Sequence, residues 1–64
     1  MHIRWTHAHH AAVDAKLRQH LDGEIEYFHK GNNGPSTHME LIDERLNDQI
    51  VENLRVVANV FVVT

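Results

Sequence analysis

The chain has 64 residues, a formal charge of −3 with its histidines neutral, and no cysteine. A chain this short forms one domain and is marginally stable alone, so a partner subunit or a metal ion would supplement its core. The absence of cysteine excludes disulfides and thiolate metal sites. Together with the lack of a signal-peptide pattern it favours a cytoplasmic location, and no apolar run is long enough to span a membrane.

The charged residues argue against nucleic-acid binding. The six basic residues are scattered singly among nine acidic ones, whereas nucleic-acid-binding proteins cluster their basic side chains.

Histidine is unusually frequent, with seven residues. Histidine titrates near pH ~6.5, so protonating all of them would change the formal charge from −3 to +4. Composition therefore predicts a response to mildly acid pH.

The first half of the chain predicts one amphipathic helix over about residues 7–30. The preceding residues, 1–6, alternate apolar and polar side chains, but over too short a stretch to establish a strand. Gly23 lies inside the predicted helix and disfavours it by about 1 kcal/mol relative to alanine. The apolar residues that recur at helical steps of three or four are Val13, Leu17, Leu21, Ile25 and Phe28.

A loop over residues 31–35 separates this helix from a second one, predicted over about residues 36–62. The loop is rich in glycine and asparagine and ends in Pro35, which cannot continue a helix. Ser36 or Thr37 would cap the second helix, with Glu40 completing a capping box. The apolar residues at helical spacing in this segment are Met39, Ile42, Leu46, Ile50, Leu54, Val57 and Phe61.

Two amphipathic helices joined by a short loop predict an all-α fold, an antiparallel helical hairpin over residues 1–64. Beyond Val51 the second helix would be apolar on all sides, and one partner helix cannot cover it. A second copy would, so we expect a homodimeric four-helix bundle. The predicted interface residues are Leu46, Ile50, Asn53, Leu54, Val57 and Phe61.

A small α+β fold is the alternative interpretation. The C-terminal residues 54–63 are rich in valine, which favours strands. Segments 23–29 and 38–42 could form a β-hairpin across the glycine-rich loop, within a β-α-β-β-α arrangement. The helical spacing through the second half of the chain favours the hairpin of helices, because a strand register would scatter these residues onto both faces.

Histidines and carboxylates provide weak candidates for a divalent metal site. His20 and Glu24 are one helical turn apart, and Glu26 and His29 have the spacing found in di-iron carboxylate bundles. His7, His9 and His10 form a further group that could bind a transition metal adventitiously. Such short patterns are common by chance, so no cofactor is expected, and a divalent metal ion is the alternative.

No glycine-rich phosphate loop, no nucleophile elbow and no Cys/His pair is present, and we therefore do not expect an enzyme. The sequence favours a small interaction or regulatory module that self-associates through the second helix and could bind a protein partner. An alternative is a helical module that responds to pH or to a metal ion through its histidines and carboxylates. A third interpretation is an artificial or truncated folding unit without catalytic function.

Overall fold

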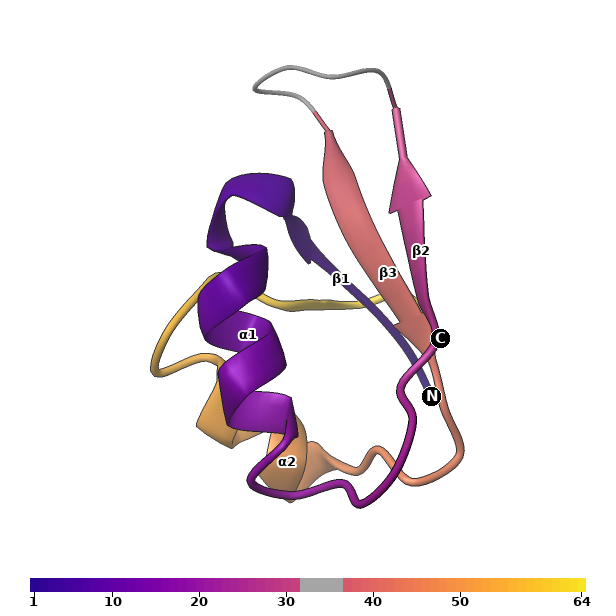
Figure 1. The fold of residues 1–64 in the computed structure, drawn as a ribbon, viewed down its shortest axis with the longest axis vertical. Coiled ribbons are helices and arrows are strands. Elements are labelled where there is room, and N and C mark those ends of the chain that lie inside the picture. The colour runs from indigo at the N-terminus through magenta and orange to yellow at the C-terminus, as the bar shows by residue number, and fades with distance from the viewer. Residues whose placement is uncertain (32–36) are drawn as a thin grey trace.

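The computed structural model describes residues 1–31 and 37–64 and shows a small α+β fold (Figure 1). Strands and helices follow one another in the order β-α-β-β-α-β, which is the split βαβ arrangement. The elements are β1 (His2–Thr6), a 3₁₀ turn η1 (His7–His9), α1 (His10–Leu17), β2 (Tyr27–Lys30), β3 (His38–Ile42), α2 (Asp48–Leu54) and β4 (Phe61–Val62).

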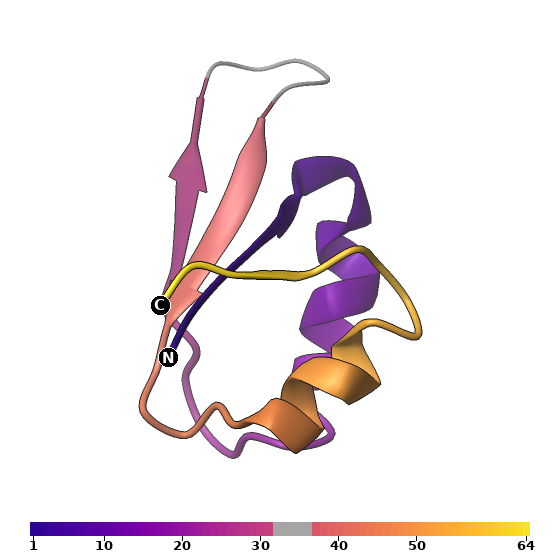
Figure 2. The ribbon, with the colours of Figure 1, turned by 180° about the vertical axis from the view of Figure 1, so that it is seen from behind.

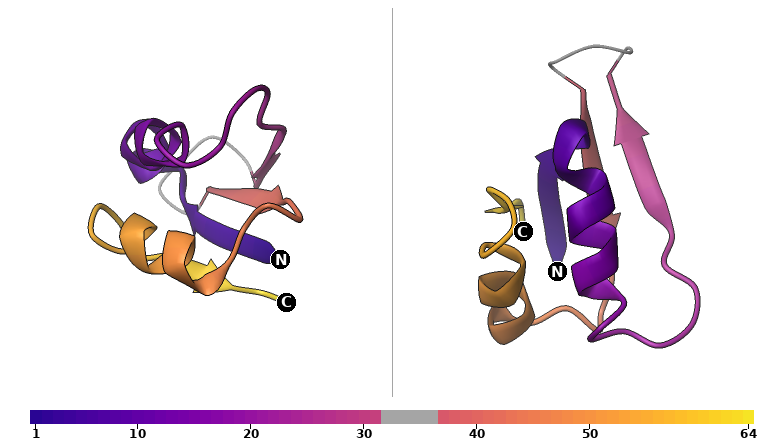
Figure 3. Two further views of the ribbon diagram at one scale, coloured as in Figure 1. Left: turned by 90° about the horizontal axis from the view of Figure 1, so that it is seen from below. Right: turned by 60° about the vertical axis from the view of Figure 1, so that its left-hand side comes forward.

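The four strands form one sheet in the order β2-β3-β1-β4, and all neighbouring strands are antiparallel. The central pair, β1 and β3, is aligned over five residues on each strand. Both helices lie on the same side of the sheet, as the views from behind and from below show (Figures 2 and 3). The two ends of the chain lie side by side, because the backbone N–H of His2 donates to the carbonyl of Thr64 at 2.8 Å.

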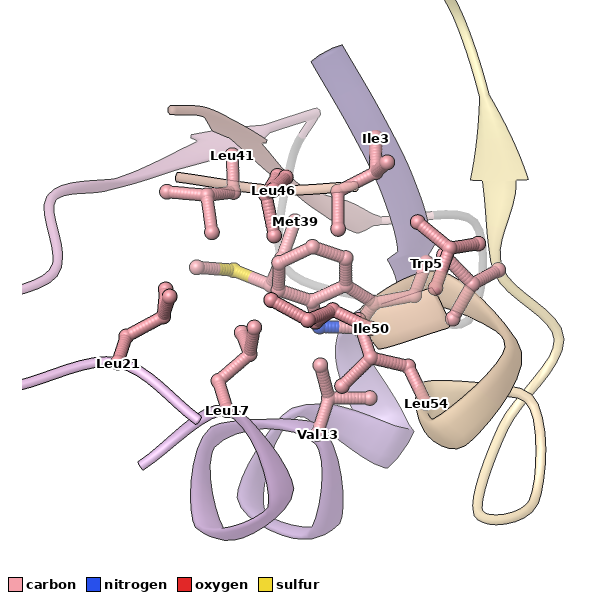
Figure 4. Packing of buried hydrophobic residues seen from close by; sticks show 12 residues of the cluster. Ile3, Trp5, Val13, Leu17, Leu21, Met39, Leu41, Leu46, Ile50 and Leu54 are labelled. Carbon is pink, nitrogen blue, oxygen red and sulfur yellow. The ribbon is translucent and has the colours of Figure 1, made fainter. Parts of the chain in front are cut away.

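The core lies between the helices and the face of the sheet that they cover (Figure 4). Successive side chains of a strand point to opposite faces, so alternate residues of β1 and β3 reach this core. Trp5 is completely buried at its centre. The buried apolar residues are Ile3, Trp5, Val13, Leu17, Leu21, Met39, Leu41, Leu46, Ile50, Val51, Leu54 and Val60.

The predicted helix over residues 7–30 is wrong beyond Leu17, where α1 ends. Gly23, six residues further on, has a φ of +81°, a conformation that other residues rarely adopt and that does not occur in an α-helix. The chain then enters β2, where alternation along the strand replaces the helical period. Tyr27 faces the ring of Trp5, whereas Phe28 is exposed.

The predicted helix over residues 36–62 is also wrong, because within the described part of this range, residues 37–62, only Asp48–Leu54 is an α-helix. The side chain of Asn47 accepts a hydrogen bond from the backbone N–H of Ile50 at 2.9 Å and caps α2 at this later point. Glu40 belongs to β3 and not to a capping box. Ser36 and most of the predicted loop 31–35 lie outside the described residues, while Gly31 directly follows β2.

The all-α hairpin and the four-helix bundle are therefore both wrong. The residues at helical spacing in the second half belong to several short elements, and only Met39, Leu46, Ile50 and Leu54 are buried in the core, whereas Ile42, Val57 and Phe61 are exposed. Met39 and Leu41 reach the core from β3, and Ile50 and Leu54 reach it from α2. The structure instead has the α+β arrangement that valine content and the alternating segments suggested, with a short β4 at the C-terminal end.

Candidate functional site

The face of the sheet opposite the helices, here called the outer face, is covered by no other element of the described residues. Residues directly opposite each other on paired strands point to the same face. Phe28 pairs with Glu40, Glu40 with Arg4, and Arg4 with Phe61. These four residues form a straight line across all four strands, which we call the outer row.

Glu40 is the centre of a charged cluster on this face. Its side chain is only 7 % exposed. Its carboxylate contacts His2 Nε2 through one oxygen, and His38 Nε2 at 3.3 Å and Arg4 Nε at 3.6 Å through the other. An ionised carboxylate only accepts hydrogen bonds, so the imidazole of His2 donates to it.

The surroundings of Glu40 keep it ionised. Burial alone would raise the pKa of its carboxyl, but the hydrogen bond from His2 and the charges of Arg4, His2 and Lys30 outweigh burial and hold the pKa below its ordinary value. The negative charge is thus balanced within the chain. A partner could cover this face without leaving an unpaired buried carboxylate, which would be costly.

Large apolar side chains surround this charged centre. Phe28 lies on the edge strand β2, Phe61 on the opposite edge strand β4, and Ile42 at one end of β3. Their exposed fractions are 47 %, 61 % and 59 %. Large exposed apolar side chains that share one face are typical of a surface that contacts another macromolecule.

A second cluster, of histidine and aromatic rings, lies at the other face, between α1 and β2. The indole N–H of Trp5 donates to His10 Nδ1 at 3.2 Å, so a neutral His10 carries its proton on Nε2. The His10 ring lies against Trp5 and meets the ring of Tyr27 edge-on at 4.4 Å. His7 and His29 stack at 4.6 Å further out.

This environment disfavours the charged form of His10. Burial lowers the pKa of His10, and the neighbouring His7 and His29 lower it further, while Asp14 opposes them and has less influence than burial. His10 therefore remains neutral to more acid pH than an exposed histidine. The cluster couples the protonation of one histidine to the packing of Trp5.

Tyr27 connects the sheet to α1. Its hydroxyl donates to Asp14 Oδ1 at 2.6 Å, and Asp14 also accepts from Arg18 one turn along the helix. Burial and the negative Asp14 raise the pKa of Tyr27 well above its ordinary value, so the phenol stays protonated. The hydrogen bond from Tyr27 is the largest cause of the lowered pKa of Asp14.

Replacing Tyr27 by phenylalanine is expected to raise the pKa of Asp14 towards its ordinary value and to lower the free energy of unfolding by about 1 kcal/mol. A carboxyl whose folded pKa is lowered stabilises the fold at every pH above its unfolded pKa, and this stabilisation is lost as pH falls through the folded pKa. The variant lacks the hydrogen bond that lowers the Asp14 pKa, so it is less stable than the wild type at neutral pH. An NMR titration of the Asp14 carboxyl and urea unfolding at pH ~7 check both effects. An unchanged Asp14 pKa would contradict the assigned hydrogen bond.

The predicted metal ligands are not brought together. No group of three or more His, Asp or Glu side chains placed to hold a metal ion occurs in residues 1–31 and 37–64. His20 Nε2 lies 3.3 Å from Asn53 Nδ2, while His29 stacks on His7. Glu24 and Glu26 are exposed in the connection between α1 and β2. Nothing in this geometry favours a divalent metal.

The predicted interface residues fall into two groups. Leu46, Ile50 and Leu54 are buried in the chain's own core and are not available to a partner. Asn53 is partly buried and contacts His20. Val57 and Phe61 remain exposed, at 37 % and 61 %, but only Phe61 lies in the sheet. The long second helix that was predicted to present these residues on one side, as a dimer interface, is not formed.

Sequence reasoning missed the outer row because its members are far apart in the chain. Two signals could have found part of it. Residues 2–6 alternate strictly, with Ile3 and Trp5 apolar and the residues between them polar, which is typical of a strand with one buried face. Asn47 followed by Asp48 is a helix start, and would have separated β3 from α2.

Comparisons with known proteins identify no relative. The chain matches no protein-family model, no curated protein and no solved structure. Among the helices of the described residues, none has the length and apolar character needed to cross a membrane. Function must therefore be inferred from the geometry of this chain.

Proposed function

We propose that the chain is a small, non-enzymatic interaction module that binds another polypeptide through the outer face of its sheet. The observation that carries this proposal is the outer row, in which an ion-paired centre lies between two exposed aromatic side chains. The centre can be desolvated because Glu40 is already paired, and the aromatic rings provide apolar area that a partner would bury.

The proposed binding surface is the outer face of the sheet and not the predicted second helix, so different residues would contact a partner. The helices are occupied in covering the core, and their apolar residues are buried. Large exposed apolar residues remain on the outer face and in the segment after α2. Of these, Phe28, Ile42 and Phe61 share one surface with charged groups that give it specificity.

Site-specific photocrosslinking tests the proposal. A benzophenone amino acid is placed at position 28, at position 61, or at the control position 56 on separate copies of the chain. Val56 is 78 % exposed and lies outside the sheet. In cells that naturally contain the chain, we expect discrete crosslinked products from positions 28 and 61 and none from position 56. No product from either face position, or equal products from all three, would overturn the proposed binding surface.

A further inference from the structure

We propose that the occupant of the outer face is a second copy of this chain, packed face to face about a two-fold axis parallel to the central strands. This inference rests on the proposed function, because it names the partner for the same surface. A two-fold contact uses one surface on both copies, so the surface must be complementary to itself. The order of residues in the outer row meets that requirement.

The row reads aromatic, carboxylate, guanidinium, aromatic from β2 to β4. A half-turn about an axis parallel to the strands turns the sheet over and reverses the order of its strands. The β2 edge of one copy then lies over the β4 edge of the other. Phe28 meets the partner's Phe61, and this contact occurs twice in the pair.

The same rotation brings opposite charges together in the middle of the interface. Glu40 lies over the partner's Arg4, and Arg4 over the partner's Glu40. A half-turn about an axis across the strands would instead place each Glu40 over the partner's Glu40, which is unfavourable for like charges. The alternation of charge therefore selects one of the two face-to-face arrangements.

Arg4 is the member of the charged pair that reaches the surface. Its Nε is buried 3.6 Å from Glu40 Oε2 of the same chain, so only the rest of the guanidinium group can contact a partner. The side chain is 43 % exposed on the outer face. A guanidinium group has five N–H donors, so the exposed part of Arg4 can face the negative charge of the partner's Glu40 while Nε stays beside its own Glu40.

The size of the face predicts a weak pair. Strands lie about 4.8 Å apart and rise about 3.4 Å per residue, so four strands with at most five residues each cover about 300 Å². Stable dimers usually bury about 800 Å² on each subunit. We expect a concentration-dependent dimer with a dissociation constant between about 10 µM and about 1 mM.

Charge substitutions at the two aromatic positions test both the dimer and its axis. Sedimentation equilibrium of the purified chain, from about 10 µM to about 1 mM, should show a monomer–dimer equilibrium. Phe28→Asp and Phe61→Lys should each raise the dissociation constant at least about tenfold, since each loses two aromatic contacts. The double variant Phe28→Asp/Phe61→Lys should recover much of the association, because each aspartate then faces a lysine of the partner.

Val56→Asp is the matched control and should leave the dissociation constant unchanged, because Val56 lies outside the sheet. Circular dichroism confirms folding of each variant, and the reversed pair Phe28→Lys/Phe61→Asp repeats the test if one double variant is unfolded. A monomeric wild-type chain at about 1 mM would overturn the second copy as partner. A dimer that the double variants fail to restore would overturn the proposed axis.

The two proposals fail in different ways. If the purified chain is monomeric but positions 28 and 61 still crosslink to another polypeptide in cells, the outer face is a binding surface for a different protein. A crosslinked product with twice the chain mass of 7.4 kDa supports the second copy. Absence of any crosslink from the face overturns the binding surface itself.

Discussion

Replacing Leu54 by alanine is expected to remove most of the folding free energy of the monomer. Leu54 is completely buried on α2, with its side chain directed into the core around Trp5 (Figure 4). Truncating a buried leucine costs about 2–5 kcal/mol, because apolar contact is lost and a cavity remains. A domain of 64 residues has a total stability of about 3–10 kcal/mol. Urea unfolding followed by the fluorescence of the single tryptophan measures the loss.

Val56→Ala is the control for this substitution, because Val56 is 78 % exposed just after α2. Its free energy of unfolding should stay within about 0.5 kcal/mol of the wild-type value. The loss in Leu54→Ala should be independent of protein concentration, since Leu54 contacts only its own core. A loss that disappears at high concentration would show that Leu54 lies in an interface and would contradict its place in the core.

Mild acid is expected to destabilise the fold through His10. In the folded chain the pKa of His10 is below its ordinary value of about 6.5, so the unfolded chain binds the proton more tightly. The contribution of His10 is therefore complete above about pH 6.5 and is lost as pH falls towards the folded pKa. Protonation also turns Nδ1 into a donor that faces the indole N–H of Trp5. An unpaired buried donor costs about 1–3 kcal/mol.

The variant His10→Asn should flatten this dependence, because its amide oxygen can accept from Trp5 and does not titrate. His9→Asn is the matched control, since His9 is exposed on the neighbouring turn. Thermal melts between about pH 5.5 and 7.5 compare the three chains. His7, His29 and Asp14 also face His10, and remain in both variants. An equal fall in Tm for His9→Asn and His10→Asn would contradict the assignment to His10.

The sequence predicted part of the core but not the elements that carry it. Leu46, Ile50 and Leu54 were expected to leave water and are buried, whereas Ile42, Val57 and Phe61 of the same predicted helix are exposed. Their helical spacing was misleading because β3, the next connection and α2 each direct apolar side chains towards one core. Helical and strand periods cannot be told apart when each element is so short.

The outer row lay beyond sequence reasoning for a physical reason. Phe28, Arg4 and Phe61 are separated by most of the chain, and only strand pairing brings them into line with Glu40. A shift of one residue in any register would move its partner to the opposite face. The frequency of histidine did predict titratable groups, but the contacts of His10 with Trp5 and of His2 with Glu40 depend on the fold.

The most direct measurement of the face-to-face arrangement is the nuclear Overhauser effect between the two phenylalanine rings, the only two in the chain. Within one copy, Phe28 and Phe61 are on opposite edge strands, about 14 Å apart at three strand spacings. A chain labelled only at phenylalanine should show a cross-peak between the two rings that grows with concentration. Absence of this cross-peak under conditions where sedimentation shows a dimer would contradict the arrangement.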